Sequence, residues 1–248
     1  MTTSIDLGFI LIPEGIVKIG SDPFKDRNSQ KDEQPLHSLV LSDYFIMKCP
    51  VTNAQYLDFV EATHHRKPLF WQDGLFPEDK SNHPVVGVSY HDATAFCRWA
   101  SETTGLPIRL PTEPEWEKAA RGSDARMFPW GNDWDASLTN TREGKFGSTS
   151  PVGKYSPKGD SPFQIADMAG NVQHWISNLY GPYPYDPSDG REAFINNLDR
   201  ESNLPPVAHE TGCTSMIDSL EASLDKSVIR GSSWRESKEQ CRCAYRSW

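Results

Sequence analysis

The chain has 248 residues and a net charge of −9, from 34 acidic and 25 basic side chains. An acidic chain is a poor match for nucleic-acid phosphates, which bind basic surfaces. No apolar run reaches the roughly 18 residues of a membrane span. With 37% hydrophobic and 24% charged residues the composition is globular, and the 19 prolines exclude a bundle of long helices, because proline clashes inside a helix. We therefore expect neither a nucleic-acid nor a membrane partner.

The first part of the chain alternates apolar and polar residues, as half-buried strands do. Phe9 to Ile19 contains Pro13-Glu14-Gly15, which predicts two short strands around a turn. Ser21 to Gln34 is polar and predicts a loop. Leu36 to Met47 alternates again and predicts one strand. We expect one face of that strand to carry Leu39, Leu41, Phe45 and Met47.

Three short helices are predicted where a side-chain oxygen can accept a first-turn amide. In two of them an acidic residue three positions after the cap completes a capping-box pattern. Glycine, which tolerates the left-handed C-cap, ends the same two helices. The first helix is expected to start at Thr52 or Asn53 and to end at His64–Pro68. The second starts at Ser89, with Asp92 completing its box, and ends at Gly105. The third starts at Thr112, with Glu115 completing its box, and ends at Gly122. The acidic residues Glu113, Glu115 and Glu117 are explained by the positive end of the third helix.

Beyond Gly122 turn residues dominate, so we expect long loops within one domain spanning residues 1–248. Ala193 to Lys226 is polar and predicts an insertion. Val228–Trp234 and Cys241–Arg246 predict two paired strands. In the core we expect Trp116, Trp175 and Phe96 together, and we expect the side chains of residues 235–238 to be exposed.

The five cysteines are an odd number, so at least one thiol has no partner within the chain. They are Cys49, Cys97, Cys213, Cys241 and Cys243. The N-terminus lacks the basic and apolar regions of a signal peptide, which favours a cytoplasmic protein with reduced thiols. Their spacing matches no structural zinc site.

The segment from Asp167 to Trp175 could bind a hard cation. The Asp167 carboxylate, the Asn171 amide and carbonyls at the Gly170 bend supply the oxygen ligands that calcium prefers. A tight turn capped by Asn171, leading into a strand anchored by Trp175, explains the same residues. The composition alone favours the turn.

Six short motifs occur in a fixed order along the chain. They are Pro50–Tyr56, Pro84–Ala93, Arg109–Glu117, Pro129–Gly131, Gly170–Val172 and Arg230–Trp234. Together they resemble the formylglycine-generating enzyme, or sulfatase-modifying factor, family from about Phe9 to Trp248. Each motif alone is weakly specific, but six in register indicate the family.

This resemblance implies an α+β, C-type-lectin-like fold with small twisted antiparallel sheets, few short helices and a high loop content. It also implies calcium ions held between loops. The corresponding residues are Asn140, Thr141 and Glu143 at one site, and Asp167, Gly170 and Val172 at a second. Gly144 stands where the first site has an acidic partner, and His174 where the second has a glutamate.

The resemblance further implies chemistry that this chain does not support. Active members oxidise a substrate cysteine, using copper held between two thiolates of a C-x4-C segment. Soft thiolates suit Cu(I). The corresponding segment here is Ser233 to Cys241, with Arg235 and Glu236 near the position of the first thiolate. We therefore expect neither a copper site nor formylglycine formation.

Other relatives are ligand-display proteins, including variable proteins of diversity-generating retroelements, whose varied residues lie in this late segment. The resemblance thus implies a non-catalytic module that binds a protein or a small molecule. Arginine, tyrosine and tryptophan are the residue types that form binding hot spots. The corresponding residues are Trp234, Arg235, Glu236, Ser237, Lys238, Glu239, Arg242, Tyr245, Ser247 and Trp248. A solvated turn followed by core aromatics explains the segment equally well.

Two alternatives stay open. One is a diverged oxidoreductase of the same family, which includes copper-dependent cysteine oxidation. The other is an accessory sensor domain of a bacterial conflict system. The sequence does not separate the sensor from the display protein.

Overall fold

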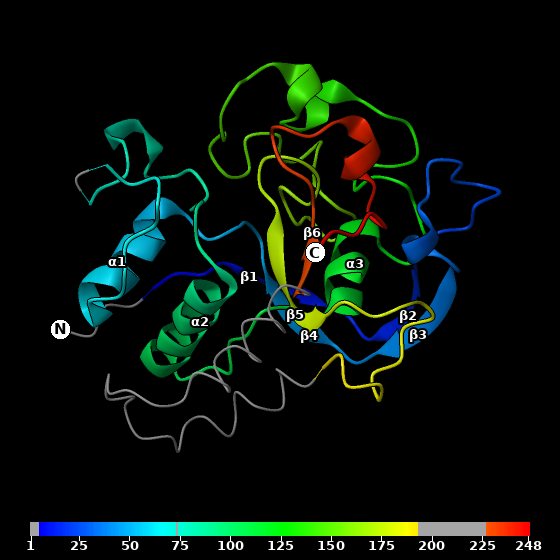
Figure 1. Cartoon of the computed structure of the whole chain (residues 1–248), viewed down its shortest axis with the longest axis horizontal. Coiled ribbons are helices and arrows are strands. Elements are labelled where there is room, and N and C mark those ends of the chain that lie inside the picture. The colour runs from blue at the N-terminus through cyan, green and yellow to red at the C-terminus, as the bar shows by residue number, and fades with distance from the viewer. Residues whose placement is uncertain (1–4, 73, 193–226) are drawn as a thin grey trace, which may run out of the picture.

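The computed structural model describes residues 5–72, 74–192 and 227–248 (Figure 1). The predicted insertion at 193–226 lies outside the described residues. Within those ranges no helix is long and apolar enough to cross a membrane. Short strands and three α-helices are joined by long loops, as expected from the turn residues.

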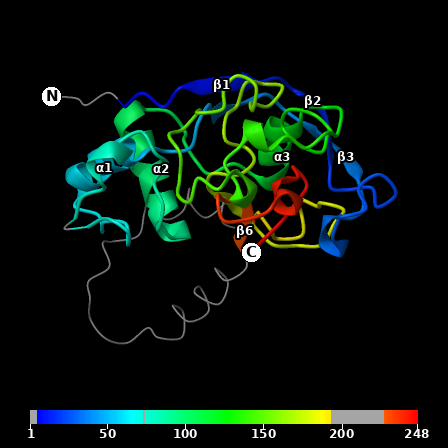
Figure 2. The same cartoon turned by 90° about the horizontal axis from the view of Figure 1, so that it is seen from above.

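Four N-terminal strands form a long antiparallel ribbon. β1 (Phe9–Ile12) pairs with β4 (Tyr44–Met47), and β2 (Gly15–Ile19) pairs with β3 (His37–Leu41). Because β1 leads directly into β2 and β3 leads directly into β4, the β2–β3 pair continues the β1–β4 pair end to end. The two strands predicted around the Pro13–Gly15 turn are confirmed. Seen from above, the ribbon runs along one side of the molecule (Figure 2).

The single strand predicted from Leu36 to Met47 is wrong, because the chain breaks at Ser42-Asp43 into β3 and β4. The two residues between the strands change which positions face the core. As a result Tyr44 and Ile46 pack on the core, whereas the Phe45 side chain is 65% exposed. A shift of one residue exchanges the two faces of a strand.

The three helices begin and end where the capping signals predicted. They are α1 (Asn53–Thr63), α2 (Tyr90–Thr104) and α3 (Glu113–Arg121). Each has a complete capping box, in which the N-cap hydroxyl accepts the amide of the third residue and that residue's side chain accepts the N-cap amide. Local hydrogen bonds therefore fix all three N-termini.

The described core is divided among four groups of buried side chains, two of them larger than the others, which corrects the expectation of a single cluster. Phe96 packs with Tyr56 and other residues of α1 and α2. Trp116 of α3 packs against β1 and β5–β6. Trp175 belongs to neither group, since it is half-buried and its indole donates to the Val88 carbonyl. In Figure 1 α1 and α2 lie on one side of the molecule and α3 with β5–β6 on the other.

The third sheet pairs β5 (His174–Leu179) with β6 (Ser227–Arg230). The predicted pairing of Val228–Trp234 with Cys241–Arg246 is wrong. Cys241 ends a short 3-10 helix. The bridge between Ile229 and Ser247 lies just beyond the second predicted strand, and the two segments are joined instead by side-chain hydrogen bonds, such as that from Arg230 to the Cys243 carbonyl. Consecutive buried residues at 241–244 do not follow the in-and-out alternation of a strand.

Candidate functional site

The segment from Trp234 to Glu239 forms a surface loop beside the start of β5. The Trp234 amide donates to the Asn171 carbonyl, and the Gln173 side chain donates to Glu236 at 3.3 Å. Glu236 also accepts the Ser233 amide at 2.7 Å. The loop is therefore held by its own side chains and by the Gly170–Gln173 turn.

A second segment, Arg142–Gly144, supports this loop from the other side. The Arg142 amide donates to the Glu236 carbonyl, and the Lys238 amide donates to the Glu143 carboxylate at 3.1 Å. A capping box of Ser237 and Gln240 then starts the 3-10 helix that ends at Cys241. The loop thus has a defined backbone although it contains no strand.

The exposed side chains of this loop carry both charges. Arg235, Lys238 and Glu239 are exposed, whereas Trp234, Glu236 and Ser237 are half-buried. The expectation that residues 235–238 are exposed is therefore correct only in part. The Arg235 guanidinium lies 4.6 Å from the Trp234 ring, a cation–π geometry that covers the aromatic face. We call residues Trp234–Glu239 the late loop.

Two of the other predicted ligand-binding residues, Ser247 and Trp248, lie away from the late loop. The Trp248 ring packs at a tilt on Tyr180, which follows the last residue of β5, whereas the late loop contacts the turn that precedes β5. Ser247 bridges Ile229 on β6. Arg242 and the half-buried Tyr245 lie beside the late loop, and the Arg242 side chain donates to the Glu239 carbonyl at 2.8 Å. The binding of a ligand by these residues stays a prediction.

Arg242 is buried and forms ion pairs with two carboxylates inside the protein. Its guanidinium donates to Glu33 at 2.5 and 2.7 Å and to Asp26 at 2.6 Å. Only 3% of the residue is exposed. Arg242 therefore ties the C-terminal segment to the loop between β2 and β3 and contributes no exposed contact surface.

A network of buried arginines on the same segment was missed by the sequence analysis. Arg246 binds Glu113 through two nitrogens at 2.7 and 3.0 Å, and Arg230 contacts both Glu113 and Glu117. Glu117 also binds Arg121. Glu113 and Glu117 are thus buried ion-pair partners, which corrects their assignment to the helix dipole alone. Arginines within apolar segments were the one available signal, because a fully buried charge needs a partner.

The described cysteines are four unpaired thiols. Burial raises the pKa of Cys49 to about 11 and that of Cys97, Cys241 and Cys243 to about 12. Cys241 donates to Ser232, and Cys243 lies in the core beside Trp116. Copper(I) binds thiolates, and these groups are protonated thiols turned into the interior. The residues of the late loop include no cysteine.

The first predicted calcium set fits a cation in part. The side-chain oxygens of Asn140 and Thr141 are buried and have no hydrogen-bond partner. Both residues are only 1% exposed, and unpartnered buried oxygens favour a ligand. Glu143, by contrast, accepts the Lys238 amide. The ligands that this loop can provide to calcium are therefore the two neutral side-chain oxygens and backbone carbonyls.

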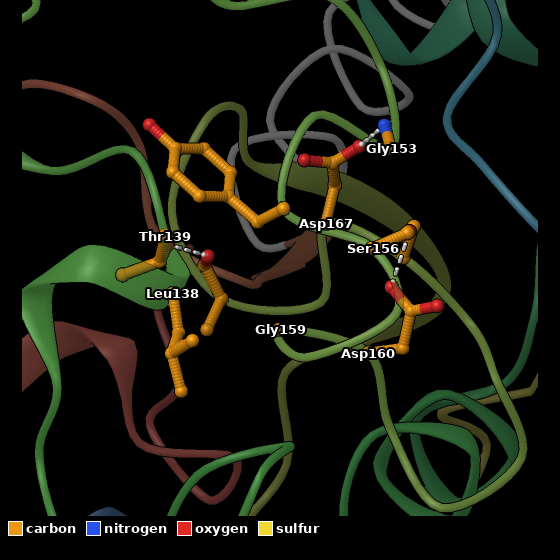
Figure 3. A pocket seen from close by; sticks show the side chains of 10 residues that line it. Leu138, Thr139, Gly153, Ser156, Gly159, Asp160 and Asp167 are labelled. Atoms are coloured by element: carbon orange, nitrogen blue, oxygen red, sulfur yellow. Dashed lines mark hydrogen bonds between the residues drawn. The ribbon is translucent and has the colours of Figure 1, made fainter.

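The side-chain oxygens of the second set are already engaged, and its binding of calcium stays a prediction. One Asp167 oxygen accepts the Gly153 amide at 2.7 Å (Figure 3). The other accepts the Asn171 side chain at 3.3 Å. Burial raises the pKa of Asp167 to about 6. At the glutamate position, Nδ1 of His174 accepts the Trp116 indole, and burial lowers the His174 pKa to about 4. Among the described residues no three His, Cys, Asp or Glu side chains cluster as metal ligands.

Residues 4–248 match the family described as the sulfatase-modifying factor enzyme 1-like domain. The serine/threonine-protein kinase pkn1 of Chlamydia caviae is 30% identical over 237 residues, which cover 89% of this chain and 32% of that protein. The chain thus spans about a third of this relative. The formylglycine-generating enzyme of Mycobacterium tuberculosis is 29% identical over 237 residues, covering 69% of this chain and 74% of that enzyme.

A solved structure, Treponema denticola variable protein 1, superposes with a TM-score of 0.69 at 20% identity, covering 100% of this chain and 91% of that one. A likeness at this identity establishes the fold. The small antiparallel sheets, few helices and long loops are consistent with the expected α+β, C-type-lectin-like architecture. The family match extends over nearly the whole sequence, and the chain belongs to the sulfatase-modifying factor enzyme 1-like domain family.

Proposed function

We propose that this chain is a non-catalytic binding module whose contact surface is the late loop. The observation that carries the proposal is an ordered, mixed-charge loop in the place where active relatives are expected to keep their copper cysteines. Arg235, Lys238 and Glu239 project from a backbone that is held on both sides by hydrogen bonds. Such a surface suits a protein or a polar small molecule, because arginine and tryptophan form most binding hot spots.

The cysteine geometry supports the absence of oxidase chemistry. Cys241 is 1% exposed and bonded to Ser232, and Cys243 is fully buried in a different part of the core. A copper site would require both thiols to ionise and to turn toward one ion. Burial opposes ionisation, and turning either side chain would leave a cavity.

Copper(I) titration of the full chain, in competition with a chromogenic chelator, tests the proposal. We expect no stoichiometric copper that survives the competition, and no oxygen-dependent oxidation of a cysteine-containing peptide. Cys241→Ser is the informative variant, with Cys97→Ser as its control on α2. Tight copper binding that disappears in Cys241→Ser, together with peptide oxidation, would establish the diverged oxidoreductase instead.

Within the binding proposal, display by a diversity-generating retroelement is the specific form we favour over a conflict-system sensor. Treponema denticola variable protein 1 shares the fold, and this likeness supports the choice. A neighbouring reverse-transcriptase gene and a near-identical repeat of the segment encoding residues 227–248 are expected. A genome that holds the gene without either would restrict the proposal to a generic interaction module.

We also propose that Asn140 and Thr141 bind calcium, since their buried oxygens have no partner. Free calcium at one hundred times its dissociation constant would stabilise the fold by about 2.7 kcal/mol. At about 2–4 °C per kcal/mol this corresponds to a rise in melting temperature of about 5–11 °C. Asn140→Ala should abolish the calcium-dependent rise, while Asn132→Ala, on an exposed turn, should retain it. An equal rise in both variants would place the ion elsewhere.

A further inference from the structure

A cavity of about 630 Å³ lies between the two halves of the core. One wall is formed by α2 and the residues that precede it, including Phe96 and Val88, and the opposite wall by Trp116 and Trp175. The β1–β4 pair contributes Tyr44 and its neighbours. A space of this size is typical of small-molecule sites, which have volumes of about 300–1,000 Å³ and are mostly apolar.

The cavity accounts for apolar side chains that are only partly buried. Val51, Val88 and Ile108 pack on the α1–α2 cluster, and Tyr44 and Ile46 on the α3–β5 cluster. All five line the cavity, so their remaining surface faces its interior. The cavity is partly open to solvent, since the exposed side chains of Phe45 and Leu106 also line it. An apolar occupant would remove the apolar surface of the wall from water, which is favourable.

The polar groups of the wall already bond to one another. The Tyr44 hydroxyl donates to the Glu115 carbonyl at 2.6 Å, and the Trp175 indole donates to the Val88 carbonyl at 3.1 Å. The Arg109 guanidinium binds the Glu115 carboxylate through two nitrogens at 2.7 and 2.8 Å. These pairs leave the wall without an uncompensated charge and with few free polar atoms.

The remaining titratable side chains of the wall are neutral near pH 7. Burial raises the pKa values of Cys49 and Cys97, which are therefore thiols, and lowers that of His174 to about 4. The Tyr56 hydroxyl and Nε2 of His174 have no hydrogen-bond partner among the described residues, but both atoms are buried behind the wall and offer a ligand no accessible donor. The accessible surface of the wall is therefore mostly apolar.

We infer that this cavity binds an uncharged, largely apolar molecule that carries at most one or two hydrogen-bond acceptors. Most of the cavity wall comes from the core clusters and the β1–β4 pair, and Gln173 of the wall also donates to Glu236 of the late loop. The inference rests on the wall residues and does not depend on the proposed binding function. A charged ligand is disfavoured because Arg109 and Glu115 neutralise one another and no further wall residue would compensate its charge.

Titration of the full chain with Nile red, a neutral fluorophore with a carbonyl oxygen, tests this inference. We expect saturable, one-to-one binding with a blue-shifted emission. Ala93→Trp fills the cavity from α2 and should weaken binding at least tenfold. Glu102→Trp adds the same indole on the exposed side of α2 and should leave binding unchanged. Circular dichroism checks that both variants are folded.

Three results would overturn the inference. They are a lack of saturable binding to the native chain, equal binding by Ala93→Trp and the native chain, and equal loss in Glu102→Trp. Should Ala93→Trp not fold, Cys97→Phe fills the same space with a smaller ring. An anionic dye of similar size, anilinonaphthalene sulfonate, should bind at least tenfold more weakly than Nile red. Equal affinity for the two dyes would contradict the uncharged ligand.

Discussion

Removing the charge of the Glu113 carboxylate is the best test of how the C-terminal segment is held in place. It is fully buried and contacts two arginines, Arg246 at 2.7 and 3.0 Å and Arg230 at 3.1 Å. Glu113→Gln keeps the shape of the side chain and removes its charge. Arg246 would then keep neutral partners but no carboxylate, with the carbonyls of Asp32 and Gly181 still accepting its hydrogen bonds. Arg230 would still contact Glu117.

The expected loss follows from the charge that remains buried. Removing one member of a buried ion pair costs about 3–5 kcal/mol, because its partner stays desolvated without compensation. A domain has a total stability of about 5–15 kcal/mol. At about 2–4 °C per kcal/mol for a chain of this size, the melting temperature should fall by about 6–20 °C.

The pH dependence gives a second readout of the same group. Burial alone would raise the pKa of Glu113, but the charges of Arg230 and Arg246 outweigh it and hold that pKa below the usual 4.5. A carboxyl with a lowered folded-state pKa contributes stability above its unfolded pKa and loses it as the pH falls through the folded value. Glu113→Gln should therefore flatten the loss of stability below pH 4.5.

The assay is denaturant unfolding of both proteins at several pH values, followed by circular dichroism. Asp124→Asn is the matched control, because the Asp124 side chain is 56% exposed and pairs with Arg126 at the surface. Surface pairs contribute about 0–1 kcal/mol, so this variant should change little. Equal losses in the two variants, or a native-like acid transition in Glu113→Gln, would refute the role of the buried network.

Three further predictions concern the same half of the molecule. Burial lowers the His174 pKa to about 4, so the free energy of unfolding should fall as the pH drops from 6.5 to 4. The variant His174→Gln should remove up to about 3 kcal/mol of that fall, as measured by denaturant unfolding at both pH values. The Cys241 thiol should react with iodoacetamide only as fast as the chain unfolds, as mapped by mass spectrometry, and rapid native-state labelling would contradict its burial. Replacing Arg235, Lys238 and Glu239 together by alanine should change the unfolding free energy by less than about 1 kcal/mol, and a larger loss would show that the late loop is structural.

The features that the sequence predicted well depend on neighbouring residues. Two helices were placed from a capping box, which joins residues three positions apart, as between Thr112 and Glu115, and the first was placed from a side-chain cap at Thr52 or Asn53. The ribbon strands were found from alternation, but the break at Ser42-Asp43 was not. The alternating pattern is compatible with one continuous strand and with two strands broken at this point. Only packing decides whether Phe45 or Tyr44 faces the core.

The ion pairs of the C-terminal segment could not be predicted in the same way. Arg230 and Glu117 are 113 positions apart, Arg246 and Glu113 133, and Arg242 and Glu33 209. No local pattern relates residues at such separations. The assignment of Arg242 to a contact surface followed from the resemblance to variable display proteins. In the structure its guanidinium turns inward instead, toward Asp26 and Glu33.

The buried arginines explain how an irregular segment can remain an ordered surface. Before the late loop, Arg230 is fixed in the core and the backbone at Ser232 turns through a left-handed conformation. After the loop, Arg242 and Arg246 bind carboxylates of the β2–β3 loop and of α3. The two ends are thus held by charges that the loop itself does not supply, while Glu236 and Ser237 hold the loop between them. The exposed side chains of Arg235, Lys238 and Glu239 can therefore change without removing the contacts that hold the fold, as the proposed display surface requires.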